Sequence, residues 1–113
     1  MAHFKVTLSA DFVRNSKRLG KRYRSWADDF AELLTGLRLN PTQGAPLGRN
    51  CYKVRLAIAS KGKGKSGGAR VLTYVKVVGE TVYLLTVYDK SEREDLAPDE
   101  LNDLLAAAGL TGE

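Results

Sequence analysis

The hydrophobic periodicity of the chain switches from helical to strand-like near residue 50, and this switch restricts the possible folds more than any other feature. Between residues 10 and 39, apolar side chains recur every three or four positions, which is typical of helices with one buried face. From residue 52 to 58, apolar and polar side chains alternate, as in a strand whose two faces meet different surroundings, and residues 69–77 and 81–88 have the composition of strands. A shorter alternation at residues 4–8 predicts one more strand before the helices.

Two helices are expected in the first half of the chain. Ser9 is a suitable N-cap for the first, which should continue to about Gly20 or slightly beyond. The second should begin after Ser25 and end before Asn40, because a proline follows at position 41. A short turn between them predicts an antiparallel helical hairpin whose apolar stripe must be covered by a sheet.

The second half of the chain is expected to contain three strands and a final helix. Residues 41–50, with two Gly and two Pro, are expected to form a surface loop. The predicted elements after it are strands at 52–58, 69–77 and 81–88, and a helix from Pro98 to Gly109. The order strand-helix-helix-strand-strand-strand-helix predicts a single α+β domain over residues 1–113, with an antiparallel sheet core and the helices packed on one sheet face.

Charge is divided unevenly along the chain. Residues 1–88 contain sixteen Lys or Arg and five Asp or Glu, a net +11, whereas residues 89–113 contain two and eight, a net −6. A basic body of this kind suits a polyanion, because each neutralised phosphate releases counterions. A merely soluble basic protein has the same composition, so charge alone leaves both interpretations open.

Several classes of protein are disfavoured by the residues present. No apolar run approaches the length of a membrane span, and residues 4–8 are too short and interrupted for a signal peptide. Cys51 has no second cysteine to pair with, and His3 is the only imidazole, so no metal-ligand set is expected. We therefore expect a reduced, cytoplasmic protein without a cofactor.

The segment from Lys61 to Gly68 is the most conspicuous basic stretch. It fits a permissive P-loop pattern, but residues 69–75 have the composition of a strand, and a working P-loop leads into a helix. A flexible loop that reaches a phosphate backbone is one interpretation, and a solvated loop that protects a sheet edge is the other. The expected RNA-binding residues come from this loop and from the basic face of the first helix. They are Lys61, Lys63, Lys65, Arg18, Lys21 and Arg22.

Three further cations have more specific geometry. Lys53 and Arg55 are two residues apart on a strand, so they project from the same face of the sheet. Arg70 on the next long strand projects similarly if Val71 faces the helices. Antiparallel pairing would then bring all three within reach of one phosphodiester, although cations on strands are usually only solubilising.

The stretches at residues 51–56, 69–74 and 82–92 resemble the central sheet of the RelE/ParE toxin superfamily. The resemblance extends from Phe4 to about Leu105, and the insertion at residues 60–68 is more similar to the HigB-like branch than to the ParE branch. By this resemblance, Arg70, Lys53 and Arg55 match the catalytic cations of the family, and Lys90 falls in its segment after the last core strand.

The resemblance implies a metal-independent endoribonuclease that cuts messenger RNA on the ribosome. A ribose 2′-hydroxyl would attack the adjacent phosphate, with Arg70 stabilising the phosphorane and Lys53 and Arg55 placing the phosphate. RelE-type members have an arginine and a tyrosine where this chain has Ser91 and Ala97. Either another side chain substitutes for them or activity is reduced; the candidates for substitution are Tyr88, Asp89 and Glu92. The acids Asp89, Glu92, Glu94 and Asp95 lie in a segment that suggests a solvated turn or helix.

Two other functions compete with this hypothesis. A ParE-like toxin would use the same fold to inhibit DNA gyrase without any nuclease activity, because fold does not determine function. The acidic C-terminal helix favours that alternative, and the cluster of Lys53, Arg55 and Arg70 opposes it. An inert RNA-binding module is the third possibility. Both toxin hypotheses imply a cognate antitoxin rich in Asp and Glu that covers the basic surface and displaces the segment 98–108.

Overall fold

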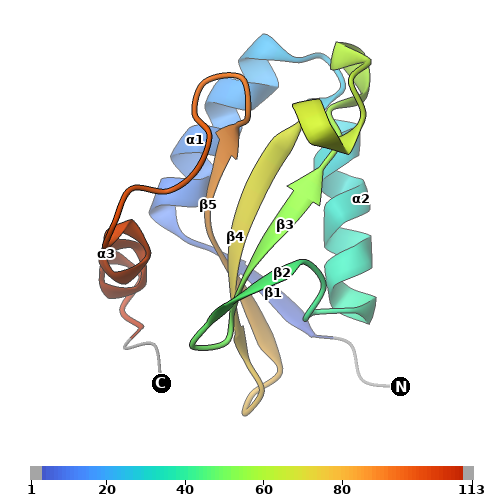
Figure 1. Ribbon diagram of the computed structural model, residues 1–113. Coiled ribbons are helices and arrows are strands. Elements are labelled where there is room, and N and C mark those ends of the chain that lie inside the picture. The colour runs from blue at the N-terminus through green and yellow to red at the C-terminus, as the bar shows by residue number, and fades with distance from the viewer. Residues whose placement is uncertain (1–3, 111–113) are drawn as a thin grey trace.

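The computed structural model describes residues 4–110, which form a five-stranded sheet with helices on both of its faces (Figure 1). His3 lies outside the described residues. The elements are β1 (Lys5–Leu8), α1 (Ala10–Arg22), α2 (Trp26–Leu39), β2 (Ala45–Gly48), β3 (Cys51–Leu56), β4 (Ala69–Lys76), β5 (Thr81–Asp89) and α3 (Glu100–Ala107), with two short 3-10 turns, η1 (Ala59–Lys61) and η2 (Lys65–Gly67). The predicted α+β order is confirmed, with one additional strand.

The additional strand is β2, which lies inside the segment expected to be a loop. It pairs with β3 through Ala45 and Lys53, and all four of its residues are exposed. A short, fully exposed strand that contains Pro46 has no alternation of buried and exposed positions, so its sequence gave no strand signal. The strand order is β1-β5-β4-β3-β2, with β1 parallel to β5 and the other pairs antiparallel.

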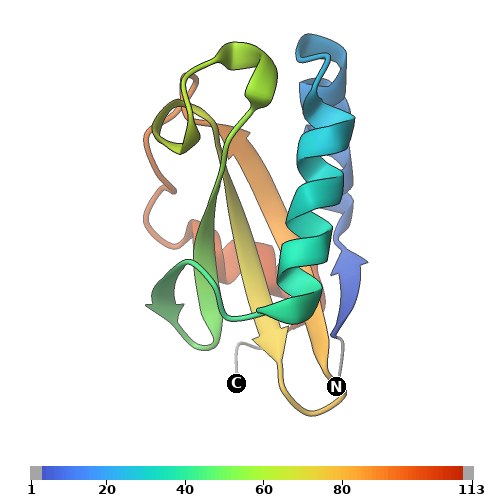
Figure 2. The ribbon, with the colours of Figure 1, turned by 90° about the vertical axis from the view of Figure 1, so that its right-hand side faces the viewer.

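Helices α1 and α2 cover one face of the sheet, side by side (Figure 2). Phe12 of α1 and Phe30 of α2 approach within 5.5 Å between ring centroids, and Trp26 stacks on Phe30. These rings belong to the same apolar core as Val71 and Val75 of β4. Burial of such side chains, at about 25 cal/mol per Å² of apolar surface, is the main force that fixes the helical hairpin on the sheet.

Helix α3 lies on the opposite face, so the expectation that all helices share one face is wrong. Its residues Leu104 and Leu105 pack in a second core with Leu72 and Tyr74 of β4. Every residue of β4 from Ala69 to Val75 is buried, which hides the alternation that would have indicated a second covered face. A central strand buried on both sides gives no such signal.

Along β4, the second core includes Leu72 and Tyr74 but does not reach the first residues of the strand. On the same sheet face, that end of β4 is occupied by a polar side chain. Leu72 and Tyr74 lie under α3, whereas Arg70, two residues earlier on the same face, lines an open cleft. Among residues 4–110, no helix has the length and apolarity that a membrane span requires.

Candidate active site

Lys53, Arg55 and Arg70 line one cleft of about 350 Å³, as the sequence predicted. Arg55 and Arg70 are direct partners in the β3–β4 ladder, and Lys53 lies one pair further along on the same face. Lys65 joins them from η2. Strand β2 begins opposite Lys53, so the edge of β3 at Arg55 has no partner in β2 and the cleft is open there.

Gly44 allows the chain to enter β2 beside this cleft. Its φ is +102°, and a Cβ at this position would lie 2.6 Å from the carbonyl oxygen of Lys53. A side chain there would clash with the backbone of β3, and the conformation itself strongly favours glycine. The glycine therefore lets the segment before β2 pack directly against the strand that carries Lys53 and Arg55.

Arg70 is the most buried of the three cations, with only 6% of its surface exposed. Its Nη1 donates hydrogen bonds to the carbonyl oxygens of Lys65, at 2.9 Å, and Ala69, at 3.1 Å. Its Nη2 donates to the carbonyl of Ser66 at 3.4 Å. The main chain of η2 thus holds the guanidinium in one orientation without neutralising its charge.

The other cations of the cleft differ in their pairing. Lys53 Nζ lies 3.1 Å from Asp95 Oδ1, in an ion pair whose carboxylate is largely exposed. A hydrogen bond from the backbone N–H of Leu96, together with Lys53, lowers the pKa of Asp95 from its ordinary value. Within residues 4–110, Arg55 and Lys65 make no hydrogen bond or ion pair through their side chains, which leaves two exposed cations beside Arg70.

Lys90 does not line this cleft. Its ammonium pairs with Glu94 at 3.3 Å, and its backbone N–H donates to the carbonyl of Gly68 at 3.0 Å. The structure therefore brings together three of the four predicted catalytic residues and places Lys90 at the neighbouring turn.

Some of the predicted RNA-binding side chains are exposed, and others are held in ion pairs. Lys63, Lys65 and Lys21 are exposed. Lys61 is instead folded inward, with 9% of its side chain exposed and its ammonium 2.8 Å from Asp89. This burial leaves Lys61 without the exposure that a phosphate contact needs. The segment Gly64-Lys65-Ser66 leads through the single 3-10 turn η2 into β4 and not into the α-helix that a P-loop needs.

Asp89 was expected to lie in a solvated turn, and this expectation is wrong. Its carboxylate is fully buried at the end of β5 and accepts hydrogen bonds from Lys61, from the Tyr23 hydroxyl at 2.5 Å, and from the backbone and hydroxyl of Ser91. Arg22 adds a longer ion pair at 3.5 Å. We call Asp89, Lys61, Tyr23, Ser91 and Arg22 the Asp89 cluster.

Hydrogen bonding dominates the titration of Asp89. Burial alone would raise the pKa of this carboxyl group, but the hydrogen bonds from Lys61, Tyr23 and Ser91 outweigh burial and hold the pKa far below its ordinary value of 3.8. The carboxylate is thus charged at any physiological pH. The sequence carries no signal that separates Asp89 from Glu92, Glu94 and Asp95, which follow it closely.

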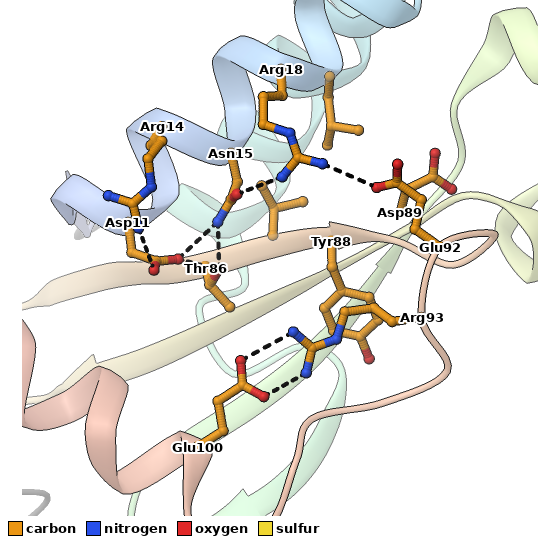
Figure 3. A pocket seen from close by; sticks show the side chains of 12 residues that line it. Asp11, Arg14, Asn15, Arg18, Thr86, Tyr88, Asp89, Glu92, Arg93 and Glu100 are labelled. Atoms are coloured by element: carbon orange, nitrogen blue, oxygen red, sulfur yellow. Dashed lines mark hydrogen bonds and ion pairs between the residues drawn. The ribbon is translucent and has the colours of Figure 1, made fainter.

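A second cleft, of about 410 Å³, lies between α1 and the segment after β5 (Figure 3). Its charged side chains neutralise one another: Arg18 pairs with Glu92 and Arg93 with Glu100. Arg22, another predicted cation of α1, also pairs with Glu92, at 2.7 Å. Two of the predicted RNA-binding cations of α1 are therefore partly neutralised by acids of the following turn.

Comparison with known proteins identifies the family. Residues 31–112 match the family model described as the RelE toxin of the RelE/RelB toxin–antitoxin system. This match covers well over half of the chain. The chain belongs to the RelE toxin family.

Solved structures of RelE toxins share the fold. A double arginine-to-alanine mutant of the E. coli toxin RelE in the free state is 17% identical, with a TM-score of 0.57 and 96% of each chain covered. The RelBE2 toxin–antitoxin complex of Mycobacterium tuberculosis is 21% identical, with a TM-score of 0.59, covering 84% of this chain and 97% of that one. The assignment to the HigB-like branch stays a prediction.

Ser91 and Ala97, where the sequence resemblance predicts a departure from the RelE pattern, have structural partners of their own. Ser91 belongs to the Asp89 cluster, and the backbone N–H of Ala97 donates to Glu100 at 2.8 Å. Of the three suggested substitutes, Glu92 pairs with arginines of α1 and Asp89 is buried. Tyr88 is the direct partner of Arg70 in the β4–β5 ladder, on the same sheet face.

Tyr88 is itself nearly buried. The guanidinium of Arg93 lies 5.1 Å from its ring centroid, and its hydroxyl donates a long hydrogen bond to the carbonyl of Glu94. Burial, and then the nearby Asp95, raise the pKa of Tyr88 above its ordinary value. At neutral pH this hydroxyl keeps its proton, so it can donate a proton more readily than it can accept one.

Proposed function

We propose that this RelE-family toxin cuts messenger RNA in the A site of the ribosome and thereby inhibits translation in the cytoplasm. The observation that carries the proposal is the convergence of Lys53, Arg55 and Arg70 on one open cleft. Three cations facing one cavity form a site for a phosphodiester, because each adds positive charge where the phosphate must bind.

The reaction needs cations beside the negatively charged phosphorane, and arginine and lysine side chains can supply them. A ribose 2′-hydroxyl attacks the adjacent phosphorus, the bond to the 5′-oxygen breaks, and the products are a cyclic phosphate and a free 5′-hydroxyl. Arg70, held by the η2 carbonyls, is placed to stabilise the phosphorane, and Arg55 and Lys53 bind the scissile phosphate. Within residues 4–110, no three His, Cys, Asp or Glu side chains lie together as metal ligands would.

Proton transfer is assigned to the same sheet face. Of the candidates that stand in for the family's missing arginine and tyrosine, Tyr88 is the ladder partner of Arg70. Its side chain lines the second cleft, so its protonated hydroxyl can donate to the leaving 5′-oxygen only after it turns away from the Glu94 carbonyl. The 2′-hydroxyl proton needs a neutral acceptor, so Lys53 is the candidate only in its uncharged amine form, after RNA binding has separated it from Asp95. RNA binding would displace Asp95 from Lys53, and Lys65 would contact the RNA backbone in the cleft. The exposed Lys63 and Lys21, outside the cleft, would contact more distant parts of the RNA.

The proposed protein partner is an antitoxin rich in Asp and Glu. Asp95 already pairs with Lys53 at the cleft, and this contact illustrates how an acidic segment can neutralise the site. An antitoxin that supplied more carboxylates would also pair with Arg55 and Lys65, and by displacing α3 it would gain the apolar face now covered by Leu104 and Leu105.

Two assays on the same induced cells test the proposal. Sequencing of messenger ends after induction should show new 5′-hydroxyl ends within coding regions, at a fixed position relative to the ribosome. Plasmid supercoiling should stay unchanged. Intact messenger together with altered supercoiling would refute the nuclease and favour a ParE-like gyrase inhibitor. Growth without any arrest would instead leave an inert RNA-binding module.

A further inference from the structure

The orientation of Arg70 depends on a loop that is anchored outside the cleft. Residues 59–68 leave the end of β3 through η1 and return to β4 through η2. The carbonyl oxygens of Lys65 and Ser66 in η2 accept hydrogen bonds from the Arg70 guanidinium. Any movement of this loop would therefore change the direction in which Arg70 presents its remaining N–H groups.

Asp89 holds the first end of this loop. Its Oδ1 lies 2.8 Å from Lys61 Nζ, and both side chains are almost completely buried. Lys61 is the last residue of η1, and its ammonium also lies 5.4 Å from the centroid of the Tyr23 ring. An ion pair in such a dry environment resists separation, because neither partner can regain water without unfolding the contact.

The residues around Asp89 hold the other end of the loop. Asp89 is the ladder partner of Ala69, and the next backbone N–H, that of Lys90, donates to Gly68. The Asp89 carboxylate fixes this turn by accepting both hydrogen bonds from Ser91. Gly68 packs so tightly on β3 that an added Cβ would lie 2.1 Å from the Leu56 carbonyl oxygen.

From these contacts we infer that Asp89 is a positioning residue of the active site, which clamps both ends of the 59–68 loop so that its carbonyls aim Arg70 at the phosphate. This inference rests on the proposed function. Asp89 itself does not contact the substrate, because its oxygens are occupied by the Asp89 cluster and lie outside the cleft. Its effect must therefore pass through Arg70.

Single-turnover cleavage of ribosome-bound messenger by purified variants tests this inference. Lys61→Met keeps the length of the side chain but removes the ion pair with Asp89. It should slow cleavage at saturating toxin by about tenfold, with the half-saturating concentration little changed, because small misplacements of catalytic groups carry rate penalties of this size or larger. Lys61→Arg should restore most of the rate, since it restores the cation.

The same change in an Arg70→Lys background separates positioning from general damage to the protein. There, Lys61→Met should alter the rate by less than about twofold, because the arginine that the loop orients is already absent. An equal loss in both backgrounds, or full activity of the single variant, would overturn the inference. Lys76→Met, at the exposed far end of β4, is the matched control and should cleave like the wild type.

Two further outcomes are decisive. If Lys61→Met fails to fold by circular dichroism, Tyr23→Phe replaces it, since it removes one hydrogen bond from Asp89 and leaves the ion pair. The same dependence on Arg70 is expected from it, with a smaller loss of about threefold. A wild-type chain that leaves messenger intact would refute the proposed function, and this inference with it, whereas active wild type with a fully active Tyr23→Phe would refute only the inference.

Discussion

Two groups of basic residues lie at the same end of the sheet and differ in what faces them. Lys53, Arg55, Arg70 and Lys65 line an open cleft, and within the described part of the chain Lys53 alone among them pairs with an acid, the exposed Asp95. Lys61 and Arg22 converge on a buried carboxylate, that of Asp89. Lysine and arginine therefore form a binding surface in the cleft, where no buried acid of residues 4–110 faces them. In the Asp89 cluster the same residue types stabilise the fold, because a buried carboxylate lies opposite them.

The Asp89 cluster should dominate stability. Asp89→Ala leaves the buried Lys61 without its counter-ion, and loss of one partner of a buried ion pair costs about 3–5 kcal/mol. Urea denaturation followed by circular dichroism measures the change. Glu92→Ala, which removes an exposed partner of Arg18 and Arg22, should cost within about 1 kcal/mol. Equal losses for the two variants would remove the distinction between the regions.

The cleft should dominate activity. Arg70→Ala removes the positive charge held by the η2 carbonyls and should slow messenger cleavage by about 10²–10³-fold, the usual cost of losing a donor that stabilises a transition state. Arg70→Lys keeps the charge but loses the planar fork, so an intermediate rate is expected. Primer extension on ribosome-bound messenger gives both rates, and wild-type cleavage by Arg70→Ala would end the assignment of the site.

Arg55 should contribute mainly to binding. Arg55→Ala removes an exposed cation that has no acidic partner among the described residues, so one phosphate contact is lost. In a fluorescence titration between low and moderate salt, the plot of log affinity for single-stranded RNA against log salt should become less steep, by roughly 0.7 in slope. Lys5→Ala, exposed on β1 at the far edge of the sheet, is the control. An unchanged slope for Arg55→Ala would place the phosphate elsewhere.

The smallest effect expected is the pH dependence of stability. Because the pKa of Asp89 is lowered in the folded chain, its contribution to stability is complete well above the unfolded value of 3.8 and is lost as the pH falls toward the folded pKa. Between pH 5 and 3.5 this one group should account for a loss of about 0.6 kcal/mol. Denaturation series of the wild type and of Asp89→Asn at each pH measure this loss, and the variant should lose about that much less free energy of unfolding. The same pH dependence in both proteins would mean that Asp89 is not the titrating group.

Local patterns predicted much of the fold and part of the site. Alternation in β3 placed Lys53 and Arg55 on one face, and the length of the loop to Arg70 allowed antiparallel pairing, so their convergence followed from local geometry. Ser9 was predicted as the N-cap of α1, and its Oγ accepts the hydrogen bond from the Phe12 N–H at 3.1 Å. Interactions within a strand or a helical turn leave this kind of record in a short stretch of sequence.

Other features left no such record. The exposed strand β2 is defined by its pairing with β3, and the face that α3 covers is hidden because β4 is buried on both sides. The acids that follow β5 look alike in sequence, yet Asp89 is buried whereas Glu92 is exposed. Burial of an acid depends on which donors the fold brings to it.

The amino-acid sequence by itself determined the order of elements, the basic character of the body and the shared face of Lys53 and Arg55, because each depends on periodicity or composition over a few residues. Only the tertiary structure decided which cations remain available. Lys61 meets an acid 28 positions later in the chain, and Tyr23 meets the same acid across 66 positions. Contacts at such separations arise from packing of the whole chain, and that packing divides the cations between the cleft and the Asp89 cluster.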